Sequence, residues 1–208
     1  MRSGPPSCPG VALTFDLCPV RNEAGYDDAL IEYLTQHRIP ATFFLSGKWI
    51  AKHDAAVQHL LNIAYFEIGT HGQVHAHLPL QTAAEQREEI RRPVARLQNQ
   101  YAHKATLFRP PYGEYDDLTV EVVKALGLRF IQWSIESGDP DPRLTTDQIV
   151  GKLSRTTKPG SIIVFHANGK GRQTRQVIER LTEDVLRQKG LQPMTVSELL
   201  QCTPLGHE

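Results

Sequence analysis

Short apolar runs alternate with amphipathic stretches along most of this chain. The apolar runs have the length of β-strands and lie at residues 11–15, 41–45, 65–68, 107–109, 128–133 and 161–165. Between and after them, apolar residues recur at helical spacing over 26–36, 55–63, 82–101, 116–126, 146–156 and 172–188. A short segment at 196–200 follows as a tail. Strands that alternate with helices are typical of βαβ units, so the pattern predicts one α/β domain with parallel strands.

Capping residues locate two of the helix boundaries. Thr82 and Glu85 form a capping box, which predicts a helix that begins there and runs to about residue 101. Asp116 or Asp117 is expected to cap the next helix, and Gly127 to end it. An open doubly wound sheet and a closed barrel both fit this alternation. In either fold, function lies at the carboxyl ends of the strands.

Composition narrows the class of protein. The chain has 208 residues, 40% hydrophobic and 22% charged, which is typical of one globular domain. We expect a tail at 1–10, the domain at 11–202 and a tail at 203–208. The formal net charge of zero gives no sign of nucleic acid or of an anionic membrane as partner. No run approaches the length of a membrane span, and no signal peptide precedes the domain, although one removed earlier stays an alternative.

Three cysteines leave the compartment open. Cys8 and Cys202 lie near the two ends of the chain, and no pair has the C-x-x-C spacing of a redox motif. A bridge between Cys8 and Cys202 would form in an oxidising compartment, and free thiols are the alternative.

Polar residues with catalytic or metal-binding chemistry follow the predicted strands. Because the carboxyl ends of parallel strands meet at one edge, we expect these side chains to converge there. They are Asp16, His71, His75, Arg109, Tyr112, Glu136, Asp139 and His166. No glycine-rich phosphate loop follows the first strand, which argues against nucleotide binding.

The histidines after residue 70 form the densest of these groups. His71, His75 and His77 lie within seven positions, and the spacing of the first two places both rings on one side of a turn. Neutral imidazole is a ligand that suits zinc, copper, iron or nickel. The same spacing also occurs in hydrogen-bonded histidines without a metal.

Five motifs occur together in one order. They read TFDLCP at 14–19, H-x-x-x-H at 71–75, RPPYG at 109–113, ESGD at 136–139 and VFH at 164–166. In order and spacing the chain resembles the polysaccharide deacetylases with the NodB homology domain, from residue 11 to about residue 200. The resemblance implies a distorted (β/α) barrel of about seven parallel strands in a single domain. It also implies hydrolysis of N- or O-linked acetyl groups from sugars with one divalent metal ion. Zinc is favoured, with cobalt, nickel or ferrous iron as alternatives.

The resemblance assigns roles on the metal side of the site. His71 and His75 would hold the ion, which makes a bound water nucleophilic at neutral pH. Asp16 would be the general base that takes the proton of this water. Arg109 would hold the Asp16 carboxylate in place and keep it ionised.

The resemblance also assigns the side of the leaving group. His166 would protonate the leaving amine or alcohol, and Asp139 would orient His166 and raise its pKa. Pro111 and Tyr112 would contact the substrate, and the backbone N–H at Tyr112 would bind the oxyanion.

One position departs from the family pattern. The first family motif usually reads Thr-Phe-Asp-Asp-Gly-Pro, and its second aspartate is the third metal ligand. Leu17 stands there in this chain and cannot ligate a metal. Asp16, the Cys18 thiolate, His77 or water could complete the coordination, and we favour Asp16 with water. Pro140 replaces a family tryptophan, which changes one wall of the substrate groove.

Two other functions stay open beside deacetylation of a polysaccharide or oligosaccharide. A carbohydrate-binding pseudoenzyme would keep the groove without hydrolysis, and an amide or cyclic-imide hydrolase would share the superfamily. N-acetyl groups and a periplasmic or secreted location are favoured. The exposed aromatics expected to stack on sugar rings are Trp49, Tyr112, Tyr115 and Trp133, although core packing is the favoured role for the last.

Overall fold

The computed structural model describes residues 1–20 and 25–202. Its strands are β1 (Gly10–Leu17), β2 (Ala41–Leu45), β3 (Phe66–Thr70), β4 (Leu107–Phe108), β5 (Arg129–Phe130), β6 (Ile135–Glu136), β7 (Ile162–His166) and β8 (Gln192–Met194). Its helices are α1 (Asp28–Gln36), α2 (Gly47–Ile50), α3 (Asp54–Leu61), α4 (Ala83–Tyr101), α5 (Asp117–Ala125), α6 (Thr146–Thr156), α7 (Thr174–Arg180) and α8 (Val196–Gln201). Short 3₁₀ turns lie at Leu78–Leu80 and Pro111–Gly113, and α7 continues as a π-helical stretch at Leu181–Leu186.

The strands pair in parallel in the order β5-β4-β3-β2-β1-β7-β6, with β8 beside the start of β1. The two edge strands, β5 and β6, are joined by only the four residues 131–134. Ile131 N donates to the carbonyl of Phe108 (2.8 Å) and Ser134 N to that of Ile162 (2.9 Å), so this segment spans from one edge to the other. The sheet curls around this closure, and the predicted distorted (β/α) barrel is confirmed.

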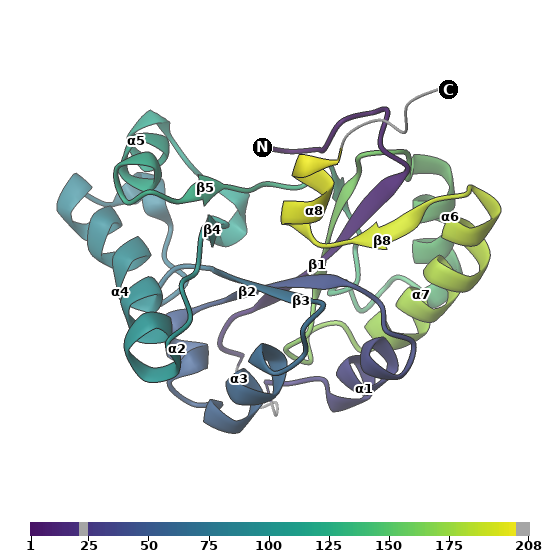
Figure 1. Cartoon of the computed structure of the whole chain (residues 1–208), viewed down its shortest axis with the longest axis horizontal. Coiled ribbons are helices and arrows are strands. Elements are labelled where there is room, and N and C mark those ends of the chain that lie inside the picture. The colour runs from purple at the N-terminus through teal and green to yellow at the C-terminus, as the bar shows by residue number, and fades with distance from the viewer. Residues whose placement is uncertain (21–24, 203–208) are drawn as a thin grey trace.

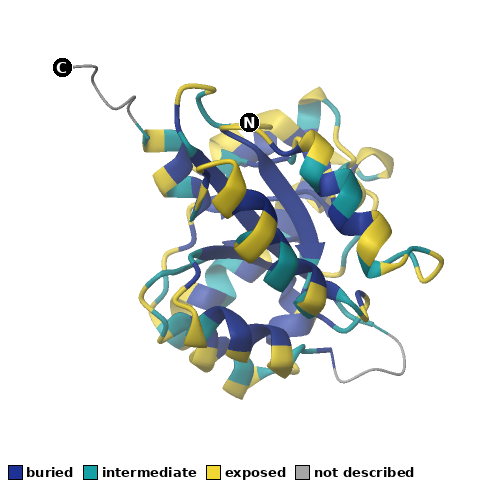
Figure 2. Ribbon diagram, turned by 90° about the vertical axis from the view of Figure 1, so that its right-hand side faces the viewer, coloured by how far each residue is buried: buried dark blue, intermediate teal, exposed yellow. Residues whose placement is uncertain are grey.

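Strand β1 is the centre of the core. All eight of its residues are buried, because neighbouring strands and helices cover both faces. Phe15 stacks on Phe43 of β2 (5.2 Å between ring centroids) and on Phe165 of β7 (5.7 Å). Figure 1 shows the helices arranged around the sheet, and Figure 2 shows the strands buried and the exposed residues on the outer faces of the helices.

Several predicted elements agree with the structure, and three others differ. The strand at 41–45 and the helix at 146–156 have the predicted bounds, and the Thr82 capping box begins α4. The predicted strand at 128–133 is wrong beyond Phe130, since the chain there leaves β5 to cross between the sheet edges. The predicted helix at 172–188 begins only at Thr174 and loosens to π-helical geometry, and the tail at 196–200 is the helix α8.

A disulfide joins the two ends of the fold. Cys8, just before β1, is bonded to Cys202, which caps α8, and Cys18 is a free buried thiol. The first residues lie against the barrel, where Gly4 N donates to the carbonyl of Gly160 (2.8 Å). The predicted tail at 203–208 lies outside the described residues. In the described part of the chain, no helix combines the length and the apolar character needed to cross a membrane.

Candidate active site

The ends of the parallel strands bring the predicted residues to one edge of the barrel. Asp16 lies near the end of β1, His71 follows β3, Arg109 follows β4, and His166 ends β7. A pocket of about 260 Å³ opens at this edge. Its lining consists of Asp16, His71, His75, Tyr112, Trp133, Glu136, Pro140, Val164, His166 and Lys170.

Asp16 and Arg109 form a buried ion pair below the pocket. Arg109 Nη1 donates to Asp16 Oδ1 (3.0 Å) and to the hydroxyl of Thr14 (2.8 Å). Burial raises the pKa of Asp16, but the neighbouring His71, Arg109 and His166 outweigh it and hold this pKa below the usual value. The carboxylate is therefore ionised at neutral pH, as a general base requires.

Aromatic rings hold the Arg109 guanidinium in position. It is fully buried, 4.1 Å from the ring centroid of Phe44 and 5.5 Å from that of Trp133. Its Nε and Nη2 are buried without a hydrogen-bond partner among the described residues. Because one nitrogen makes both polar contacts, the pair with Asp16 depends on ring packing to fix the guanidinium.

His71 presents one ring nitrogen to Asp16. Its Nδ1 lies 2.9 Å from the carbonyl of Arg109, and since a carbonyl can only accept, this nitrogen carries the proton. Burial is the main cause that lowers the pKa of His71, so the ring is neutral and Nε2 is an unprotonated donor atom. This Nε2 lies 3.6 Å from Asp16 Oδ2. Two lone-pair donors that face each other in this way favour a cation between them.

His75 lies beside this pair on a strained backbone. Its φ of 66° is left-handed, and its ring is 4.9 Å from that of His71 and 4.3 Å from that of Tyr112. Burial, followed by the neighbouring His71, lowers the pKa of His75 to about 3. Both histidines of the predicted H-x-x-x-H motif are thus neutral and able to act as ligands.

A divalent metal fits the donors of this site in part. His71 Nε2 and Asp16 Oδ2 are spaced as two ligands of one ion can be, and the Arg109 carbonyl orients the His71 ring as outer partners of metal ligands do. Across residues 1–20 and 25–202, however, no three His, Cys, Asp or Glu side chains are placed to hold one ion. The set of His71, His75 and Asp16 stays a prediction.

The other candidates for a third ligand have different partners. Leu17 is fully buried in the main core, as its apolar side chain requires. Cys18 Sγ accepts from Lys170 Nζ and from Asn168 Nδ2 (3.3 Å each), and burial raises the pKa of this thiol. His77 is half exposed, with Nδ1 2.7 Å from Glu114 Oε2.

His166 and Asp139 form the second pair of ionisable groups at this site. Asp139 Oδ1 lies 3.0 Å from His166 Nδ1, and Oδ2 accepts from the backbone N of His166 (2.8 Å) and from the hydroxyl of Thr174 (2.8 Å). Burial lowers the pKa of His166, but the hydrogen bond and charge of Asp139 outweigh it and raise this pKa above the usual value. The ring can therefore carry a proton on Nε2, the nitrogen not bound to Asp139.

Tyr112 of the third motif lies at the rim of the pocket, and Pro111 directly precedes it. Tyr112 has a φ of 59°, is 53% exposed and stacks on His77 with ring planes 3° apart. Strained non-glycine residues such as Tyr112 and His75 cluster at functional sites. Pro111 is buried and does not line the pocket, so its predicted contact with substrate would be indirect.

Two features of the site differ from the sequence expectations. Trp49 is fully buried in the core, so its predicted stacking on sugar is wrong, whereas Trp133 lines the pocket. Lys170 was missed. The signal available for it was the Asn-Gly-Lys-Gly sequence directly after β7, which is typical of a tight loop.

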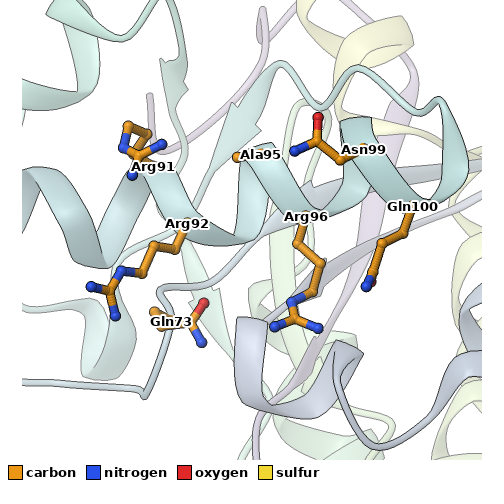
Figure 3. A pocket seen from close by; sticks show the side chains of 7 residues that line it. All are labelled: Gln73, Arg91, Arg92, Ala95, Arg96, Asn99 and Gln100. Carbon is orange, nitrogen blue, oxygen red and sulfur yellow. The ribbon is translucent and has the colours of Figure 1, made fainter.

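A larger hollow, of about 340 Å³, lies along α4 and contains none of the predicted site residues (Figure 3). Two of its arginines, Arg91 and Arg92, already pair with Glu88. We therefore place the candidate active site at the strand ends.

Comparison with known proteins identifies the family. The family model described as polysaccharide deacetylase matches residues 3–131, more than half of the chain. The bifunctional xylanase/xylan deacetylase of Cellvibrio japonicus is 31% identical over 189 residues, 90% of this chain but only 27% of that relative. A peptidoglycan-N-acetylglucosamine deacetylase of Bacillus cereus is 28% identical over 92% of this chain and 88% of its own length. The chain thus spans about a quarter of the first relative and most of the second.

Solved structures support the same assignment. A crystal structure of a peptidoglycan N-acetylglucosamine deacetylase is 26% identical, with a TM-score of 0.88 over 98% of this chain and 93% of that one. A family 4 carbohydrate esterase from Streptomyces lividans is 29% identical, with a TM-score of 0.77 over 88% and 91%. A CE4 family pseudoenzyme from Bacillus anthracis, 23% identical with a TM-score of 0.83 over 96% and 68%, shares the fold. This chain belongs to the polysaccharide deacetylase family.

Proposed function

We propose that this protein hydrolyses acetyl groups, N-acetyl in preference, from a polysaccharide or oligosaccharide. The observation that carries the proposal is that one pocket is lined by both Asp16, paired with Arg109, and His166, paired with Asp139. An ionised base and a protonated acid in one pocket are what acyl hydrolysis needs. The names of the relatives, deacetylases of peptidoglycan and xylan, agree with this chemistry.

Different residues serve the attacking water and the leaving group in the proposed reaction. Asp16 takes the proton of the attacking water, while Arg109 keeps the carboxylate ionised and fixed. His166 Nε2 gives a proton to the leaving nitrogen, and Asp139 holds the ring so that this nitrogen faces the pocket. The Tyr112 backbone N–H is proposed to stabilise the oxyanion.

We also propose that the reaction depends on one divalent metal, with zinc favoured. His71 and His75 would hold it, and Asp16 would contribute through Oδ2, the oxygen that faces His71. When bound, such an ion lowers the pKa of a water and polarises the acyl carbonyl. Cys18 is engaged by Lys170 and His77 by Glu114, which makes Asp16 with water the better completion of the site.

The function is tested by acetate release from a panel of acetylated glycans. Asp16→Asn should lower the rate at least about 100-fold while the fold is retained, because a general base contributes on that order. Asp147→Asn removes an exposed carboxylate that pairs with Arg180 on the surface and should keep the parental rate. If Asp16→Asn stays fully active, Asp16 is not the base.

Metal dependence is tested by the stoichiometry of zinc after loading and removal of the excess. We expect about one ion per chain in the parent and none in His71→Ala, which should also lose acetate release. His59→Ala is the matched control, since His59 contacts Tyr26 away from the pocket. An active His71→Ala protein would exclude this mechanism.

Leu17 replaces the third metal ligand of the family pattern, and this replacement favours a second function, carbohydrate binding without hydrolysis. With Leu17 in the core and no three-residue donor group among the described residues, the chain could bind carbohydrate without hydrolysing it. The stoichiometry experiment separates the two functions. A protein that binds an acetylated glycan but holds no metal and releases no acetate would be such a binder.

The disulfide bears on the compartment. Disulfides persist in oxidising environments and are rare in the cytosol of most organisms. The Cys8–Cys202 bond therefore supports a periplasmic or secreted protein, which would meet cell-wall or extracellular polysaccharide.

A further inference from the structure

A second hollow adjoins the catalytic pocket. Pro140 and Lys170 line both, so the two hollows share one wall and lie side by side. The second hollow has a volume of about 330 Å³, compared with about 260 Å³ for the catalytic pocket. A polymer with its acetylated unit in the catalytic pocket can place a neighbouring unit in the second hollow.

The two carboxylates of this hollow are already neutralised. Asp139 is buried and accepts hydrogen bonds from His166 and from the hydroxyl of Thr174. Asp141 forms a two-bond pair with Arg143, with distances of 2.9 and 2.7 Å. Neither is therefore a free anionic group that would oppose an acidic ligand.

The two remaining charged groups, Lys170 and Arg172, have no such compensation. Among the described residues, no carboxylate oxygen lies within 4.0 Å of a nitrogen of either side chain. Lys170 Nζ donates to Cys18 Sγ (3.3 Å), which is a contact with sulfur and not with a carboxylate. The hollow therefore carries uncompensated positive charge.

The loop after β7 is shaped to place these groups. Asn168 donates to the carbonyl of Cys18 (2.9 Å), and its Oδ1 accepts from Lys170 N (3.3 Å). At Gly171 an added Cβ would lie 2.0 Å from Thr174 Oγ1 and 2.5 Å from Asp139 Oδ2. Glycine thus allows the backbone to pass over Asp139 and carry Lys170 and Arg172 to the two sides of this point.

We propose that this hollow binds an acid-bearing sugar next to the acetylated unit, and that its carboxylate is recognised by Lys170 and Arg172. The substrate class is then an anionic acetylated glycan, an inference that rests on the proposed deacetylase function. Glu136 lines the catalytic pocket but not the hollow, so an acid group is disfavoured in the first and favoured in the second. The charge pattern would fix which unit of an alternating polymer is deacetylated.

A pair of substrates that differ only in the charge of their carboxyl groups tests this proposal. The probe is the peptide-free glycan tetramer of N-acetylglucosamine and N-acetylmuramic acid, used as the free acid and as its methyl ester. For the parent we expect a KM about five-fold lower for the free acid, with similar kcat, and a difference that shrinks at high salt. Arg172→Gln should abolish most of this preference, and Arg172→Lys should keep part of it. Arg175→Gln, which removes a surface partner of Glu179, should keep the full preference.

Each result decides between the proposals. Equal KM values for the two forms in the parent, or an unchanged preference in Arg172→Gln, overturn the acid-recognition proposal and leave deacetylation intact. If neither form releases acetate, the deacetylase proposal fails for this glycan. The acid-recognition proposal is then decided by the affinities of the two forms, measured by calorimetry. Tighter binding of the free acid that is lost in Arg172→Gln supports recognition of the acid, and equal binding overturns it.

Discussion

Asp16 and Asp139 are both buried carboxylates, and their neighbours suit them to different tasks. Arg109 engages Oδ1 of Asp16, whereas Oδ2 faces His71 and the pocket. Both oxygens of Asp139 are engaged by hydrogen bonds to His166 and to hydroxyl groups. One carboxylate keeps an oxygen available for the chemistry, and the other can only position and charge its histidine.

Asp139→Asn should move the alkaline limb of the pH–rate profile to lower pH. His166 acts as an acid only when protonated, and Asp139 raises its pKa above the usual 6.5, so activity extends to higher pH in the parent. The amide removes the negative charge and lets this pKa fall. The limb is read from kcat/KM against pH, with Asp147→Asn as the control that should not move it. An unmoved limb in Asp139→Asn would assign it to another group.

Arg109→Leu should destabilise the fold by about 3–5 kcal/mol, because it leaves Asp16 charged and buried without its partner. The measurement is the free energy of unfolding in urea. Arg91→Leu removes an exposed partner of Glu88 on α4 and should cause no measurable loss. Equal small losses in both variants would mean that solvent reaches Asp16 when Arg109 is removed.

At the residue scale, the sequence predicted which groups meet but not all of their contacts. Asp16, His71 and Arg109 were predicted because each stands at the end of an apolar run, and parallel strands bring such ends together. Lys170 was not predicted to belong to the site, because its position depends on a contact with Cys18, which lies 152 positions away in the sequence. Burial of Trp49 was missed for the same reason, since the sequence of a four-residue helix does not show what covers it.

The elements follow local sequence wherever local chemistry sets their ends. Capping boxes begin α4, α5, α6 and α8, and three of these helices, α4, α5 and α6, start within a residue of the predicted position. The segment after β5 is different. Its apolar residues Ile131 and Trp133 have a high strand propensity, but the segment connects the two edges of the sheet and does not extend β5. Closure of the barrel overrides the local preference there.

Thr82→Ala should lower the free energy of unfolding by about 1 kcal/mol, because it removes the hydroxyl that accepts from Glu85 N at the start of α4. Chemical denaturation measures this loss. Thr156→Ala is the control, since that hydroxyl only donates to the carbonyl of Lys152 in the last turn of α6 and caps no helix. A similar loss in both variants would mean that the cap contributes nothing specific.

At the scale of the whole molecule, the barrel and the disulfide close the chain in two ways. The segment 131–134 joins the sheet edges, and the Cys8–Cys202 bond joins residues separated by 194 positions. Pairing of the two cysteines was open from the sequence, because spacing alone does not bring the chain ends together. Packing of α8 against β1 and β8 does so in the structure.

Reduction of the disulfide should lower the melting temperature. A cross-link over a loop of this length constrains the unfolded chain, and its loss costs up to about 5 kcal/mol by loop entropy. Thermal unfolding with and without reductant measures the change. The double variant with Cys8→Ser and Cys202→Ser should melt at the lower temperature and should not respond to reductant. An identical melting temperature for parent and double variant would contradict the expectation.

The same bond decides how the molecule carries mechanical load. If the segments beyond residues 8 and 202 were pulled apart, as between a cell surface and a polymer, the tension would pass through the sulfur atoms of Cys8 and Cys202. Once the contacts of residues 1–7 with the barrel had given way, the strands between the two cysteines would carry little of this tension, and the pocket at their ends would keep its shape under the pull. An oxidised molecule would thus stay folded at forces that unravel a reduced one.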